Sequence, residues 1–176
     1  MILKSIRYQL LLQQYKNRIY SYSLYMLKDK MDAEDVTQEV LIKMWLNLGK
    51  FNMTAAASWI MKTTHNLCID YLRKRNVETK RNWDVEQLSE QLISSNKTED
   101  NPLTAAHYKL AKEKIKEAII RLPEQLKSIF VLYEINGLKY KEISKILDIP
   151  INSVRVYLLR ARRKLQEELK CYEPKD

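Results

Sequence analysis

The chain has 176 residues, and its 31 Lys and Arg against 22 Asp and Glu give a formal net charge of +9. This length suits one medium domain or two small ones, and a hydrophobic content of 45% argues against a disordered chain. Only 2 Gly and 4 Pro argue against the many turns of an all-β fold, so helices are favoured. A basic chain suits a polyanionic partner, either nucleic acid or an anionic membrane surface.

The composition also limits which disulfides, metal sites and membrane segments the chain can contain. Two cysteines, Cys68 and Cys171, are too few for a disulfide framework or a four-ligand zinc site. His65 and Cys68 form a weak metal pair because two further ligands are not apparent, so we expect no metal and no cofactor. No apolar run approaches the ~20 residues of a membrane span, and no cleavage signal follows Lys4 and Arg7. We therefore expect a cytoplasmic protein without membrane insertion.

A first helical block is predicted over residues 5–77. Its opening helix, Ile6 to Leu27, has one apolar face. The residues of that face are Leu10, Leu11, Tyr15, Ile19, Tyr22 and Met26. Asp32 is predicted to cap the next helix, and Gly49 to end it. A core stripe and a second, mostly polar stripe run along this helix. They consist of Val36, Val40, Met44 and Leu48, and of Asp35, Gln38, Glu39 and Ile42.

A third helix is predicted from Ala55 to about Asn76. Its inward residues are predicted to be Ile60, Thr63, Thr64, Leu67 and Tyr71, and its other face holds Lys62, Asn66, Ile69 and Arg73. Residues 78–105 follow as a predicted flexible linker, since periodicity fades there and Asn101-Pro102 is a breaker. This linker is acidic and includes Asp84, Glu86 and Glu90.

A second helical block is predicted over residues 106–172. Pro123 fits the start of a helix, and Gly137 fits a residue after a helix end. A short helix from Tyr140 to Leu147 and a last helix from about Ile151 to Lys170 then form a helix-turn-helix. One stripe of the last helix is predicted to be buried, and it holds Val154, Leu158, Ala161 and Leu165.

The opposite face of the last helix has the chemistry of a DNA reader. Arg donates two hydrogen bonds to a guanine edge, and Asn reads an adenine edge in the major groove. The candidates for base reading are Asn152, Ser153, Arg155 and Val156, because the N-terminal part of such a helix enters the groove. Basic residues further along, such as Arg160 and Arg163, suit phosphate contacts.

At this point the sequence resembles the extracytoplasmic-function (ECF) RNA polymerase sigma factors. In the second block the resemblance lies in Leu122-Pro123-Glu124, in residues 137–143, in Ser153-Val154-Arg155 and in residues 160–165. In the first block it lies in residues 32–40, which are similar to the polymerase-binding segment, and in residues 59–74, which are similar to the promoter-melting segment. The resemblance implies an all-α chain of two small helical domains, called regions 2 and 4, joined by the linker.

The resemblance also implies partners and site residues. Asp35, Gln38, Glu39 and Ile42 would bind the clamp coiled coil of the largest subunit of core RNA polymerase, and region 4 would contact the flap of the second subunit. Residues on the third helix would hold the −10 DNA as a single strand, with Asn66 at a flipped base. These are Trp59, Lys62, Asn66, Arg73, Lys74 and Arg75. For Trp59 a position in the core is favoured over a stacking contact with DNA.

Region 4 would read the −35 DNA and departs from the family at two positions. Lys139 stands where relatives often have a capping Ser, and Asp148 must adopt the left-handed turn that Gly often supplies. Because a lysine amine can bind a phosphate, Lys139 and Lys141 are also predicted to contact the DNA backbone. An anti-sigma factor or another recruiting protein is a further expected partner, and the acidic linker would pass through the basic channel of the polymerase.

Three alternatives stay open at this point. A helix-turn-helix regulator that never joins polymerase would explain the last helix but leave the first block unexplained. A nuclease could use the acids Asp32, Glu34, Asp35 and Glu39 for Mg²⁺, although the first three suit a helix start. A structural adaptor would make no DNA contact. The sigma-factor interpretation predicts no catalytic residue, because the phosphodiester chemistry belongs to the polymerase.

Overall fold

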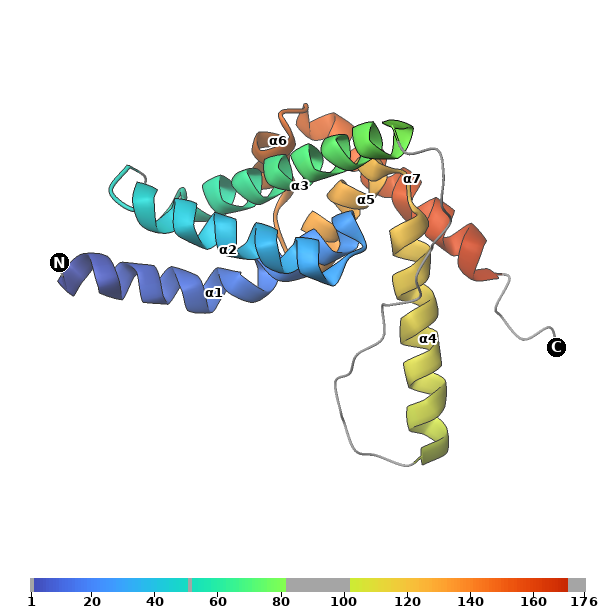
Figure 1. Cartoon of the computed structure of the whole chain (residues 1–176). Coiled ribbons are helices and arrows are strands. Elements are labelled where there is room, and N and C mark those ends of the chain that lie inside the picture. The colour runs from blue at the N-terminus through green and yellow to red at the C-terminus, as the bar shows by residue number, and fades with distance from the viewer. Residues whose placement is uncertain (1, 51, 82–101, 171–176) are drawn as a thin grey trace.

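The computed structural model describes residues 2–50, 52–81 and 102–170, which fold into helices joined by short turns (Figure 1). The predicted linker acids Asp84, Glu86 and Glu90 lie outside these residues. The helices are α1 (Ile2–Leu27), α2 (Lys30–Asn47), α3 (Ala56–Arg81), α4 (Pro102–Arg121), α5 (Glu124–Phe130), a π-helical turn η1 (Val131–Ile135), α6 (Tyr140–Leu147) and α7 (Ile151–Lys170). None of the described helices is long and apolar enough to cross a membrane.

Helices α1, α2 and α3 pack side by side around the predicted apolar stripes (Figure 1). The stripe predicted for α2 is buried at all four positions. On α1 the prediction is right except at Leu10, which is 54% exposed. Leu10 is one residue before the buried Leu11, and successive helical residues are about 100° apart, so Leu10 turns away from the core.

The predicted start of α2 is wrong by three residues. Asp29, and not Asp32, caps the helix, since its Oδ1 accepts a hydrogen bond from the Asp32 backbone N–H at 2.9 Å. Lys28 makes the turn before it with a φ of 62°. Two other helices extend into the predicted linker: α3 continues to Arg81, and α4 begins at Pro102.

Helices α4 to α7 form a second group, with α6 and α7 as the predicted helix-turn-helix. The α7 stripe is buried at all four predicted positions. The two residues expected to take left-handed geometry do so, with φ of 67° at Gly137 and 56° at Asp148. The Lys139 side chain makes no cap bond, as predicted, and its backbone N–H instead donates to Glu142 Oε2 at 2.8 Å.

The two groups of helices lie against each other. Helix α6 packs on α3, and both α5 and η1 contact α1 (Figure 1). Asn136, which is 2% exposed, donates from Nδ2 to the Arg18 carbonyl at 3.1 Å. At the edge of the contact, Lys62 Nζ donates to the Lys145 carbonyl at 3.5 Å. We refer to this packing of α4–α7 on α1–α3 as the closed arrangement.

A buried lysine makes the stability of this fold depend on pH. Lys127 on α5 is 5% exposed. Burial, and then the positive charge of Lys28, lower its pKa from 10.5 to about 8, against an opposite effect of Glu124. Below pH 8 the folded protein must hold a buried charge, and this penalty fades as the pH rises towards 10.5, where the unfolded chain also loses the proton.

We therefore expect the Lys127→Met variant to be more stable than the wild type at pH 7, by about 1–3 kcal/mol. The difference should shrink between pH 8 and pH 10, because the wild-type amine becomes neutral there. Urea unfolding at each pH measures both free energies. A difference that stays constant over this range would contradict the assignment.

Candidate nucleic-acid interface

The exposed face of α7 presents the predicted base-reading residues. Asn152, Arg155 and Val156 are exposed, whereas Ser153 is half-buried at the side. They lie in the first turns of the helix, opposite its buried stripe, which fixes α7 against the rest of its group. Arg160 and Arg163 are exposed one and two turns further along. One face of the helix therefore carries both hydrogen-bond donors and apolar groups. This is the combination that suits the major groove of DNA.

Aromatic rings hold the arginines of α7 in place. The Arg155 guanidinium lies over the Tyr140 ring at 5.8 Å, and Tyr140 stacks on Tyr133 with ring centroids 5.0 Å apart. Such cation–π contacts restrict a long side chain before it meets a partner. Arg162 lies over the Tyr133 ring at 5.5 Å, and in addition its Nη2 and Nε donate to Glu134 Oε1 at 2.6 and 3.0 Å.

A shallow hollow of about 440 Å³ lies beside the exposed face of α7. Arg160, Arg163 and Lys164 line it from α7, and Pro123 and Leu126 line it from the other side. Glu167 also lines the hollow, but the three cations outnumber this one carboxylate, and their charge suits phosphate contacts better than base contacts. Lys164 belongs to the basic run of residues 160–164 but was not among the predicted site residues.

The predicted −10 residues do not all share one face of α3. Lys62, Asn66 and Arg73 are exposed on one side of the helix. Arg73 forms an ion pair with Asp70 at 3.7 Å, and the Lys74 amine lies 5.9 Å from the Tyr71 ring. The two remaining predicted residues, Trp59 and Arg75, are half-buried.

Trp59 and Arg75 are engaged within the protein. Trp59 packs against the hydrophobic core, which agrees with the favoured sequence interpretation. Arg75 is bound to the corner between α1 and α2, where it pairs with Asp32 and with the Leu27 carbonyl. The structure therefore places Arg75 apart from Lys62, Asn66 and Arg73.

Next to Asn66, the inner side of α3 is buried and uncharged. His65 Nδ1 shares a hydrogen bond of 2.8 Å with the Tyr22 hydroxyl, and burial lowers the pKa of His65 to about 4. Burial raises the pKa of the Cys68 thiol to about 12, and the thiol lies 3.6 Å from the Ser23 hydroxyl. His65 and Cys68 thus have separate partners, and within the described residues no group of three or more such side chains could hold a metal ion.

The mostly polar stripe of α2 is accessible. Asp35, Gln38 and Ile42 are exposed, and Glu39 forms an ion pair with Lys43 at 3.2 Å. Two apolar residues on the same side were not predicted: Met31 is 76% exposed and Leu46 is 67% exposed. They lie about three turns before and one turn after Ile42. We call Met31, Asp35, Gln38, Glu39, Ile42 and Leu46 the α2 face.

Two family models match the chain in the order of its helices. The model described as Sigma-70 region 2 matches residues 11–77, and the one described as Sigma-70, region 4 matches residues 112–165. The ECF RNA polymerase sigma factor SigM of Bacillus subtilis is 30% identical over 154 residues, which are 88% of this chain and 90% of SigM. This chain belongs to the ECF sigma factor family. SigW of the same organism is 29% identical over 159 residues, covering 89% of this chain and 85% of SigW.

Solved structures share the fold of this ECF sigma factor. The sigma factor RpoE of Bartonella quintana, in complex with the anti-sigma factor NepR, matches with a TM-score of 0.76 and 23% identity, over 92% of this chain and 95% of that one. CnrH, in complex with the cytosolic domain of CnrY, matches with a TM-score of 0.64 and 18% identity, over 93% and 88%. Both likenesses support the two-region helical fold.

Family membership assigns region 2 to α1–α3 and region 4 to the helices that end in α7. The chain therefore acts in promoter-directed transcription initiation with RNA polymerase. Leu159, which is 49% exposed on the same side of α7 as Val156, is a further residue that the site prediction omitted. Exposed apolar side chains of this kind suit contact with a thymine methyl group. An apolar side chain on an otherwise polar face was its signal in the sequence.

Proposed function

We propose that this sigma factor binds core RNA polymerase through the α2 face, reads −35 DNA with α7 and holds −10 DNA with α3. The observation that carries the proposal is the separation of these surfaces. An acidic and apolar face suited to protein lies on α2, and basic faces suited to DNA lie on α3 and α7. The order of the two matched regions supports the same assignment.

The proposal includes the partners expected from the sequence. The α2 face would contact the clamp coiled coil of the largest subunit, and region 4 the flap of the second subunit. The chain would work in the cytoplasm and contribute no catalytic residue of its own. A regulatory anti-sigma factor is a further proposed partner, because the RpoE and CnrH structures are complexes with such proteins or with a partner's cytosolic domain.

The test is binding to purified core polymerase, measured by the change in fluorescence anisotropy of the labelled protein. We expect the protein to form a stable complex with core. We also expect promoter DNA to be bound only when core is present. The alternative, a helix-turn-helix regulator, predicts DNA binding by the chain alone and no binding to core. That result would contradict the proposal.

One substitution tests the role of α7 directly. Arg155→Ala removes the fork that can read a guanine edge, so we expect holoenzyme affinity for the −35 element to fall by about 1–3 kcal/mol, or roughly 5- to 150-fold. The preference at one base position should relax at the same time. Promoter variants with each base at every −35 position measure both effects.

Arg162→Ala is the matched control, because Arg162 lies on the same helix but is bound to Glu134. It should leave the base preference unchanged. Equal losses from both substitutions at every base position would mean that α7 contributes only general charge, and would contradict base reading by Arg155.

A further inference from the structure

Arg75 lies on the same side of α3 as the buried residues of this helix, and not on its basic side. Thr64 and Cys68 on that face are fully buried. Arg75 follows Cys68 by about two helical turns, which returns it to the same side. Arg73 and Lys74 precede it in sequence but are rotated away from this side by about 100° per residue. The run of three basic residues is therefore divided between different faces of the helix.

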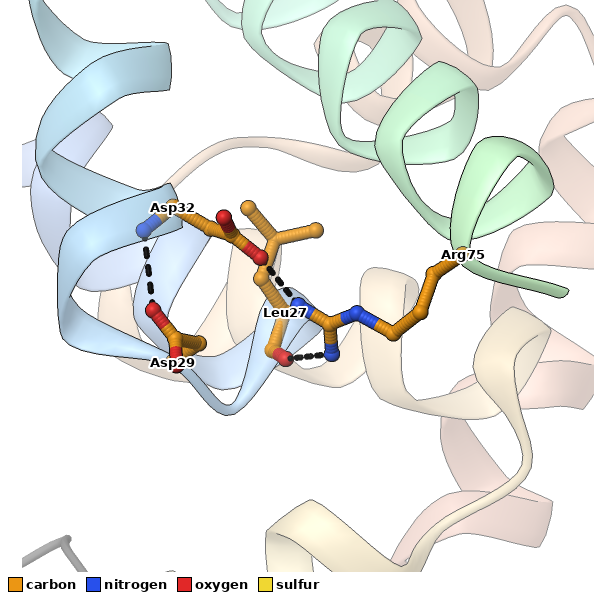
Figure 2. Close-up of polar contacts among 4 residues, drawn as sticks. All are labelled: Leu27, Asp29, Asp32 and Arg75. Atoms are coloured by element: carbon orange, nitrogen blue, oxygen red, sulfur yellow. Dashed lines mark hydrogen bonds and ion pairs between the residues drawn. The ribbon is translucent and has the colours of Figure 1, made fainter. Parts of the chain in front are cut away.

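The Arg75 side chain joins three helices at one corner (Figure 2). Its Nη1 donates to the carbonyl of Leu27, the last residue of α1, at 2.9 Å. Its Nη2 pairs with Asp32 Oδ2 in the first turn of α2. Asp29 holds the Asp32 backbone from the other side. A rigid guanidinium fork suits such a two-point contact, which a lysine amine would not reproduce.

The Arg75 contact gives the end of α1 a hydrogen bond that the helix cannot make by itself. The last four carbonyls of a helix have no partner within it, and Arg75 supplies one to Leu27. The Asp32 and Arg75 side chains are 30% and 43% exposed, so water screens their ion pair. The pair therefore fixes where α3 lies relative to the corner more than it stabilises the whole fold.

The corner lies between the two functional faces of region 2. Asp32 precedes Asp35 of the α2 face by one turn, and Arg75 follows Arg73 and Lys74 of the proposed −10 face. Tyr71 lies in the same region, since burial and then the charges of Asp35, Glu39 and Asp32 raise its pKa. The end of α3 is thus close to the acids of the helix that would bind polymerase.

We propose that Arg75 is a positioning residue that fixes the end of α3 against the α1–α2 corner, so that polymerase bound on α2 places Arg73 and Lys74 for −10 DNA opening. This role rests on the proposed function. It differs from the direct phosphate contact that the basic sequence run predicts for Arg75. Asp32 is the partner of Arg75 in this role and does not itself touch DNA.

The test uses holoenzyme assembled from core polymerase and the full chain, on a promoter mapped with the wild type. The variants are Arg75→Gln, Arg75→Lys, Asp32→Asn and the double variant Asp32→Asn with Arg75→Gln. Two quantities are measured: the salt dependence of promoter binding, and the rate of DNA opening at saturating holoenzyme, followed by permanganate reactivity of −10 thymines. Lys74→Gln is the control for a phosphate contact.

We expect Arg75→Gln and Asp32→Asn to slow opening by about tenfold each, and the double variant by no more than either. Arg75→Lys should fall between these and the wild type. The slope of log affinity against log salt should stay unchanged in all four, whereas Lys74→Gln should make it shallower by about one.

Two results would overturn the positioning role. In the first, Arg75→Gln makes the salt slope shallower while Asp32→Asn has no effect, as for a phosphate contact. In the second, the variants open DNA more slowly only in proportion to the folded protein that they lose, as measured by circular dichroism. This would indicate a role in stability alone. Failure of the wild type to open DNA would instead overturn the proposed function, and with it this role.

Discussion

A cross-link that holds α6 on α3 is expected to lower promoter-dependent transcription by about a hundredfold or more. In the closed arrangement these helices touch, with Lys62 Nζ 3.5 Å from the Lys145 carbonyl. Elements centred near −35 and −10 are about 25 base pairs apart, or on the order of 80 Å at ~3.4 Å per pair. If α7 reads −35 DNA and α3 holds −10 DNA as proposed, region 4 has to leave region 2 on the promoter, because α6 lies against α3 in the closed arrangement.

The experiment uses cysteines at both positions, Lys62→Cys and Lys145→Cys, with Cys171 replaced by Ser and the buried Cys68 retained. A short cleavable bismaleimide joins them. The same variant before linking is the control, since it already lacks the Lys62 amine. Cleavage of the linker should restore transcription. Full activity of the linked protein would mean that the two regions need not separate.

Acidic substitutions on the α2 face give the second large effect. Ile42 and Leu46 are 60% and 67% exposed, and apolar side chains of this kind are anchors when a partner covers them. We expect the double variant Ile42→Asp with Leu46→Asp to bind core polymerase about a hundredfold more weakly or worse, because each position loses about 1–3 kcal/mol of apolar burial. Competition with labelled wild-type protein for core measures the loss.

Leu10→Asp is the matched control for this surface. Leu10 on α1 is 54% exposed, so one negative charge, half of the charge that the double variant adds, is placed on an exposed leucine outside the α2 face. Core affinity should be unchanged. Equal losses from this control and the double variant would show that negative charge anywhere weakens binding, and would remove α2 as the docking face.

Local sequence patterns were sufficient for most of the helices. The buried stripes of α2 and α7 follow spacings of three and four residues, which burial enforces because one face must be apolar. The left-handed turns at Gly137 and Asp148 could also be predicted, since few residues tolerate a positive φ. Basic and apolar residues on α7 pointed to DNA for the same local reasons.

Contacts between distant residues could not be predicted in this way. Arg75 and Asp32 are 43 residues apart, and Asn136 and Arg18 are 118 apart, so no periodicity connects them. Where two acids compete to cap one helix, the outcome depends on the turn before it, and Asp29 prevails over Asp32. Met31, Leu46 and Leu159 were missed because exposed apolar residues are common and identify a surface only in three dimensions.

Transcription in vitro tests the central claim most directly. Core RNA polymerase would transcribe a library of genomic DNA fragments with and without the protein, and the 5′ ends of the products would be mapped. The account predicts discrete new start sites that share sequence near −35 and −10 and that disappear with the double variant of Ile42 and Leu46. An unchanged set of start sites, in the presence of active core and folded protein, would contradict it.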